Sequence, residues 1–142
     1  MISVTHLRVE NLREPLGIGT HFPKFSWQTE SDIPNFIQEA RRIELFSDGN
    51  LIWDSGEVAS PESLNIGGTP RLKAQTAYSW RVSVKYNGSW TASERSFFET
   101  GMLNKAWQGK WIAGIHNGET EQPVNYLRKS FTLDKDVASA RL

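Results

Sequence analysis

Cysteine is absent from the 142 residues of this chain. Its absence excludes disulfide bridges and cysteine-ligated metal sites, so the stability of the fold must come from its core. Residues 1–15 also lack the basic stretch and apolar run of a secretory signal. Together these two absences predict a cytoplasmic protein.

An excess of one charge sign is also missing, because 16 Lys and Arg residues balance 16 Asp and Glu residues. A neutral chain has no field that would attract nucleic acid or an anionic membrane surface. No apolar run approaches the roughly 20 residues that a membrane-spanning helix needs. We therefore expect neither a nucleic-acid partner nor a membrane.

Helical periodicity is scarce, and short apolar alternations take its place. The clearest alternation lies in residues 78–85, where apolar and polar side chains fall on opposite faces of an extended segment. The apolar face consists of Tyr78, Trp80, Val82 and Val84. This pattern predicts a half-buried strand over residues 78–85.

Two turn sequences predict β-hairpins. Asn87-Gly88 tolerates the positive φ of a tight turn, and the chain then resumes through Trp90 toward Phe97 and Phe98. The stretch 47–50, Ser-Asp-Gly-Asn, separates an alternation over 43–45 from an apolar segment over 51–53. Each pair of flanking segments is expected to pair as antiparallel strands.

Further alternations around Leu7 and Val9 and around Phe25 and Trp27 bring the total to about seven strands by Thr100. The sequence thus predicts an all-β fold, a fibronectin type III or immunoglobulin-like β-sandwich. Leu72 and Tyr78 predict a tyrosine corner, in which the phenol at the start of a strand bonds to the backbone just upstream.

The pattern changes after Gly101, so we predict three parts: the sandwich over 1–102, a linker over 103–125, and the start of a second β-sandwich over 126–142. Trp111 and Ile112 restart a strand, residues 126–133 alternate, and a further strand begins at Val137. A lone hairpin is marginal in water, so this second domain would be truncated. Its unpaired strands are also predicted to allow a dimer through a sheet edge.

Four blocks carry a resemblance to a known family: LIWDSGEVAS (51–60), LKAQTAYSWRVSV (72–84), FFETGML (97–103) and KAWQGKWIAG (105–114). In order and spacing they resemble the amino-terminal region of bacterial α-L-rhamnosidases of glycoside hydrolase family 78. The resemblance covers nearly the whole chain, since residues 126–142 look like the opening of the next sandwich. Arg41 departs from the pattern, standing where an aromatic residue is common, and its stem is expected to lie along apolar surface.

The resemblance implies that the complete enzyme removes terminal α-L-rhamnose with inversion, using two carboxyl groups in a helical barrel beyond Leu142. No catalytic residue can be carried onto this chain. The resemblance therefore implies a non-catalytic accessory module whose partners are the later domains of the same polypeptide.

The remaining polar residues favour no site. Asp54 and Glu57 flank a turn, Asp134 and Asp136 flank another, and turns select such residues without any chemistry. The three histidines, His6, His21 and His116, are far apart in the sequence and lack the spacing of metal ligands. The glycine pairs at 17–19 and 67–68 lack the context of a phosphate-binding loop. We predict no catalytic, metal or cofactor site.

Six tryptophans are many for this length. Alternation places Trp27 and Trp80 in the core. Trp107 and Trp111 straddle the domain boundary, which favours interdomain packing. Trp53 and Trp90 adjoin turns, so an alternative function is a carbohydrate-binding module in which they contact rhamnose-containing glycans. A fibronectin-type protein-interaction module is a third alternative.

Overall fold

The computed structural model describes residues 1–114 and 124–137 of the chain. The chain divides into two units, Met1–Ala106 and Trp107–Leu142. The predictions for residues 115–123 and 138–142, including that for His116, lie outside the described residues. The first unit runs a few residues past the predicted boundary at residue 102, and that boundary stays a prediction.

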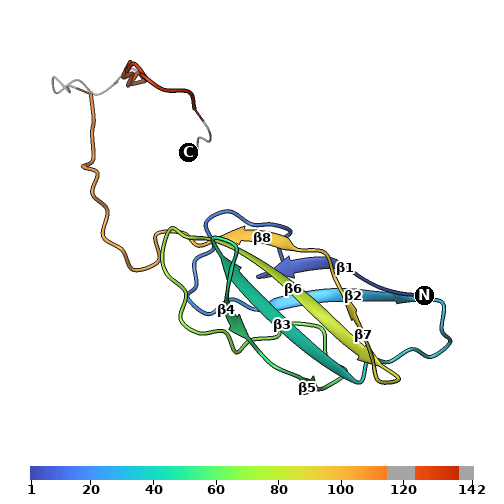
Figure 1. Ribbon diagram of the computed structural model, residues 1–142. Helices are drawn as coiled ribbons and strands as arrows, with labels where there is room; N and C mark the ends of the chain where they lie inside the picture. Colours follow the sequence, from blue (N-terminus) through green and yellow to red (C-terminus); the bar gives the residue numbers. More distant parts are fainter. Residues whose placement is uncertain (115–123, 138–142) are drawn as a thin grey trace. The chain divides into compact units, whose positions relative to one another are not determined.

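The first unit is all-β, and Figure 1 shows its strands in two sheets. A small sheet pairs β1 (Ile2–Val9) with β2 (Phe25–Ser31). The larger sheet consists of β3 (Ala40–Ser47), β4 (Asn50–Asp54), β5 (Val58–Ala59), β6 (Ala77–Tyr86), β7 (Ser89–Ala92) and β8 (Ser96–Glu99). Its strand order is β4-β3-β6-β7, and in addition β5 pairs with β3 and β8 pairs with β6. All these pairs are antiparallel.

Both predicted hairpins are confirmed, with turns that require positive φ. Asp48 and Gly49 have φ of 49° and 79°, and Asn87 and Gly88 have φ of 46° and 73°. Two successive positive φ values define the hairpin turn that matches the twist of the flanking strands. The strand expected after Trp90 forms as two pieces, β7 and β8, which pair with opposite ends of β6.

A third segment extends the small sheet without forming a regular strand. The N–H of Phe25 donates to the carbonyl of Ile66 at 2.9 Å, and the N–H of Ile66 returns a bond to Phe25 at 2.8 Å. The N–H of Trp27 donates to the carbonyl of Ser63 at 3.0 Å. Residues 63–66 therefore cover the edge of β2.

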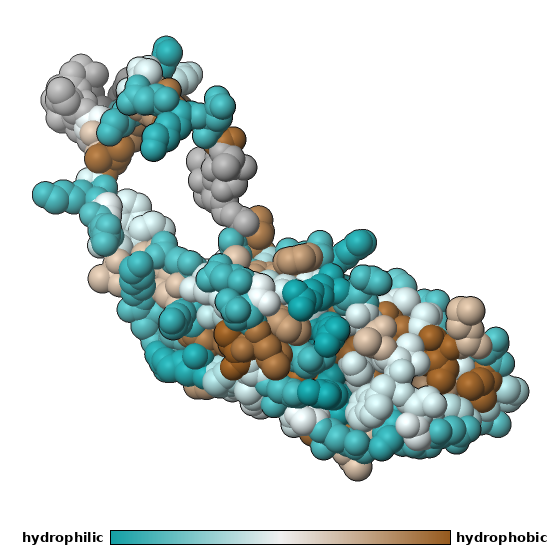
Figure 2. Space-filling view, viewed as in Figure 1, coloured by the Kyte–Doolittle hydropathy of each residue, from teal (hydrophilic) through white to brown (hydrophobic). Residues whose placement is uncertain are grey.

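The core lies between the two sheets and is made by the inward residues of both. Trp27 and Trp80 are 1% and 0% exposed, in agreement with the alternation. Phe25 of β2 packs on Trp80 of β6, with their ring centroids 4.5 Å apart. This contact joins the sheets into an immunoglobulin-like sandwich. On the face seen in Figure 2, hydrophilic side chains cover most of the sandwich and hydrophobic ones form separate patches.

The second unit has no strand in its described residues, 107–114 and 124–137. The strands expected at Trp111 and over 126–133 are not formed there. Alternation can place side chains on two faces, but a strand also needs a partner for its backbone N–H and C=O groups. The assignment of residues 126–142 to a second sandwich stays a prediction.

No helix long and apolar enough to cross a membrane occurs in the described residues.

Candidate functional site

Tyr78 stands at the start of β6, and its side chain reaches back to the preceding loop. Its hydroxyl oxygen accepts a hydrogen bond from the backbone N–H of Lys73 at 3.0 Å. Tyr78 and Leu72 are both buried, and the Tyr78 ring stacks on Phe98 of β8 with centroids 5.4 Å apart. The phenol thus fixes the entry of the 72–76 loop into the larger sheet, which is a structural role.

Trp53 and Trp90 lie on different strands at opposite edges of the larger sheet, β4 and β7. Trp53 pairs with Leu45, so its side chain lies on the core side, where it packs partly buried against the core. Trp90 pairs with Lys85 on the outer side and is 40% exposed. The two rings therefore do not form one platform for a sugar.

Trp107 and Trp111 belong to the second unit and are exposed by 82% and 104%. With Gly109 and Lys110 they line a hollow of about 340 Å³. The same unit exposes a further set of apolar side chains: Ile112, Val124, Tyr126, Leu127, Phe131, Leu133 and Val137. The described residues of this unit therefore expose many large apolar groups to water.

Asp54 is engaged in a structural ion pair. Arg42 donates from Nε to both carboxylate oxygens at 2.9 and 3.1 Å, and its Nη2 donates to Oδ2. The hydrogen bond from Arg42 holds the pKa of Asp54 below its usual value, and a bond from the N–H of Gly56 acts in the same direction. Glu57 instead pairs with Lys85 at 2.8 Å. Each of the two carboxylates therefore has its own cation as a structural partner.

The histidines of the described residues are also separate. His21 bonds through Nδ1 to the carbonyl of Leu72 at 2.8 Å, whereas His6 lies 3.0 Å from the hydroxyl of Thr5 on β1. Within residues 1–114 and 124–137, no cluster of three or more His, Asp or Glu side chains could hold a metal ion.

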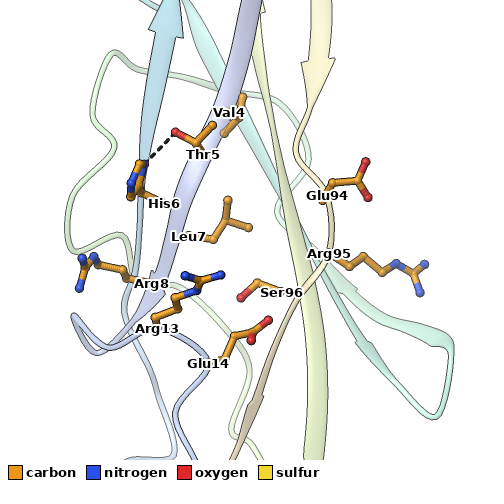
Figure 3. A pocket seen from close by; sticks show the side chains of 10 residues that line it. All are labelled: Val4, Thr5, His6, Leu7, Arg8, Arg13, Glu14, Glu94, Arg95 and Ser96. Carbon is orange, nitrogen blue, oxygen red and sulfur yellow. Dashed lines mark hydrogen bonds between the residues drawn. The ribbon is translucent and has the colours of Figure 1, made fainter.

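A hollow of about 380 Å³ lies beside β1, and Figure 3 shows the side chains that line it. A register shift between Thr5 and Arg8 and a φ of 52° at His6 distort the strand here. Arg8 donates to the carbonyl of Asn11 at 3.0 Å, and Arg95 lies 3.8 Å from the centroid of the Phe46 ring. Two of its three arginines are thus used by the protein itself.

A second hollow, of about 330 Å³, opens between the sheets near β4 and β5. It is lined by residues that alternation places on the core side, together with turn residues: Arg41, Ile43, Trp53, Asp54, Ser55, Val58, Ile66, Gly67 and Gly68. Nη1 of Arg41 is buried without a hydrogen-bond partner among the described residues. The sequence signal for this site is the arginine at position 41. From the sequence alone we predict only that its aliphatic stem lies along apolar surface.

Comparison with known proteins shows which proteins this chain is similar to. A family model described as Rha78A-like, N-terminal immunoglobulin domain, matches residues 4–104. A protein of Formosa agariphila named alpha-L-rhamnosidase is 33% identical over 159 residues, which cover 96% of this chain and 17% of the relative.

Two solved structures have the same fold over most of the chain. The Streptomyces avermitilis alpha-L-rhamnosidase complexed with L-rhamnose matches with a TM-score of 0.76 and 32% identity, covering 81% of this chain and 12% of that one. The alpha-L-rhamnosidase from Dictyoglumus thermophilum matches with a TM-score of 0.70 and 29% identity, covering 78% and 14%. The chain therefore spans less than a fifth of the length of these relatives.

Proposed function

Because the chain belongs to the family of Rha78A-like N-terminal immunoglobulin domains, we propose that it is a non-catalytic accessory domain of a longer α-L-rhamnosidase. The observation that carries this proposal is the family match over residues 4–104. The rhamnosidase from Formosa agariphila aligns with 96% of this chain but only 17% of itself. Most of that protein lies outside the region that this chain resembles, so its catalytic domain can lie there too.

The accessory role is a mechanical one. Trp107, Trp111 and the other exposed apolar residues of the second unit form the surface that we expect to pack against later domains. Burying large aromatic rings at such a joint removes apolar area from water at roughly 25 cal/mol per Å² and fixes the orientation of the sandwich. The ion pairs of Asp54 and Glu57 support the absence of a catalytic role.

The test compares hydrolysis of p-nitrophenyl α-L-rhamnoside by this chain and by the longer polypeptide that contains it. We expect activity in the longer polypeptide and none in the 142-residue chain. Hydrolysis by the chain alone, at a rate proportional to its concentration and after repurification, would disprove a non-catalytic role.

A second measurement tests the joint. In the longer polypeptide, Trp107→Ala is expected to lower the unfolding free energy by about 2 kcal/mol or more, as truncation of a buried aromatic anchor does. Trp90→Ala removes a ring that is 40% exposed on the sandwich and serves as the matched control. Equal, small effects of the two substitutions would show that Trp107 anchors nothing.

A further inference from the structure

Arg41 is the second residue of β3 and lies on the inward face of this strand, where an apolar side chain is usual. Ile43 and Leu45, two and four residues further, are 1% and 0% exposed core residues. Directly opposite Arg41 on β6 stands Val84, which is 1% exposed. Residues directly opposite in an antiparallel pair point to the same side, so the Arg41 side chain enters the space between the sheets.

Arg41 forms no ion pair among residues 1–114 and 124–137. Its Nη1 has no hydrogen-bond partner among the described residues, and it is a buried atom. The acid that lines the hollow, Asp54, is already bonded by Arg42 and by the N–H of Gly56. The Arg41 side chain as a whole is partly exposed, but a buried guanidinium nitrogen without an acceptor is still costly. Such a group requires an explanation, and an absent anion is one.

Trp53 supplies a second type of surface to the same hollow. It lines the space together with Arg41 and the glycines at 67 and 68. The volume of about 330 Å³ falls within the range of roughly 300–1,000 Å³ that small-molecule sites occupy. An indole face packs against the C–H face of a sugar ring, whereas a guanidinium binds a carboxylate through two parallel hydrogen bonds.

We propose that this hollow binds a uronic acid residue, with the carboxylate on Arg41 and the sugar ring against Trp53. The site belongs to the sandwich alone and does not depend on the accessory role or on any rhamnosidase activity. It also differs from the notion of a sugar platform made by Trp53 and Trp90, because those rings lie at opposite edges of the sheet.

The experiment titrates the 142-residue chain with D-glucuronate, L-rhamnose and acetate, and follows the indole N–H signal of Trp53 by NMR. Trp53→Phe assigns that signal, and Trp90→Phe is its matched control. We expect D-glucuronate to shift the Trp53 signal and to bind at least tenfold more tightly than L-rhamnose or acetate. Equal binding of acetate, equal binding of L-rhamnose, or no binding of D-glucuronate would each overturn the proposal.

Two variants locate the site. Arg41→Gln is expected to weaken D-glucuronate binding at least tenfold, whereas Arg13→Gln, which removes an exposed arginine from the other hollow, should change it less than twofold. Gly67→Leu gives a second variant in case Arg41→Gln affects folding. A Cβ at Gly67 meets nothing within 4 Å and its φ is not left-handed, so the backbone accepts the leucine, whose side chain should fill the hollow. Binding that survives either Arg41→Gln or Gly67→Leu contradicts the proposal.

Discussion

The two units of the chain treat the same kind of residue in opposite ways. In Met1–Ala106, Trp27 and Trp80 are 1% and 0% exposed, whereas Trp107 and Trp111 in the second unit are exposed by 82% and 104%. Alternating apolar residues form β6 in the first unit, but the alternation over 126–133 forms no strand in the second. The difference teaches that an apolar pattern folds only where the chain also supplies the opposing sheet.

The largest expected difference concerns the tryptophans themselves. Trp80→Ala is expected to lower the unfolding free energy by roughly 3–5 kcal/mol, because it removes a fully buried ring between the sheets. Trp107→Ala in the same 142-residue chain should change it by less than about 0.5 kcal/mol. Urea denaturation monitored by circular dichroism measures both. Comparable losses in the two variants would break the distinction between the units.

Tyrosines give a finer version of the same comparison. Tyr78→Phe removes the acceptor of the Lys73 N–H at 3.0 Å and leaves that donor unpaired in a part-buried position. We expect a loss of about 1–2 kcal/mol in the unfolding free energy. Tyr126→Phe, in a side chain that is 94% exposed, is the control and should have no measurable effect. If Tyr78→Phe leaves the unfolding free energy unchanged, water must accept the hydrogen bond of the Lys73 N–H in place of the phenol.

Acid titration is expected to show the smallest difference. Arg42 lowers the pKa of Asp54 in the folded state, so the contribution of this pair is present above the unfolded pKa of about 3.9 and is lost as the pH falls through the folded pKa. Because the pair is largely exposed, solvent screening keeps its contribution to the unfolding free energy small. The difference in unfolding free energy between wild type and Asp54→Asn should therefore shrink below about pH 4.

The matched control for this titration lies in the second unit. Asp134 is exposed and has no ion pair among the described residues. Asp134→Asn should have the same unfolding free energy as wild type at pH 7, as an exposed substitution without partners does. A gap between wild type and Asp54→Asn that grows on acidification would reverse the sign that we assign to the Arg42 pair.

Much of the sandwich could be predicted because its local signals agree with its tertiary structure. The alternation from Tyr78 to Val84 predicted β6, and Asn87-Gly88 predicted the turn that follows it. Residues 63–66 gave no alternation, because they contribute a few backbone hydrogen bonds to β2 rather than a two-faced strand. Such an edge segment has no periodic signature to detect.

The candidate sites were harder to predict because they depend on which face a residue takes. Trp53 was grouped with Trp90 by its position near a turn, but register places it on the core side and Trp90 on the outer side. Arg41 was noticed as an unusual residue, yet only its position opposite Val84 shows that its charge enters the space between the sheets. Sequence alone gives the residue type, whereas pairing gives the neighbours.

The position of β6 in the larger sheet has a consequence for how the chain folds during synthesis. β6 pairs with β3 on one side and with both β7 and β8 on the other. Until the ribosome has released β6, β3 has no partner on that side, although β4 and β5 already cover the other. At about 5–20 residues per second, this edge stays open for times on the order of seconds. We therefore expect the emerging chain to be most prone to intermolecular strand pairing in that interval.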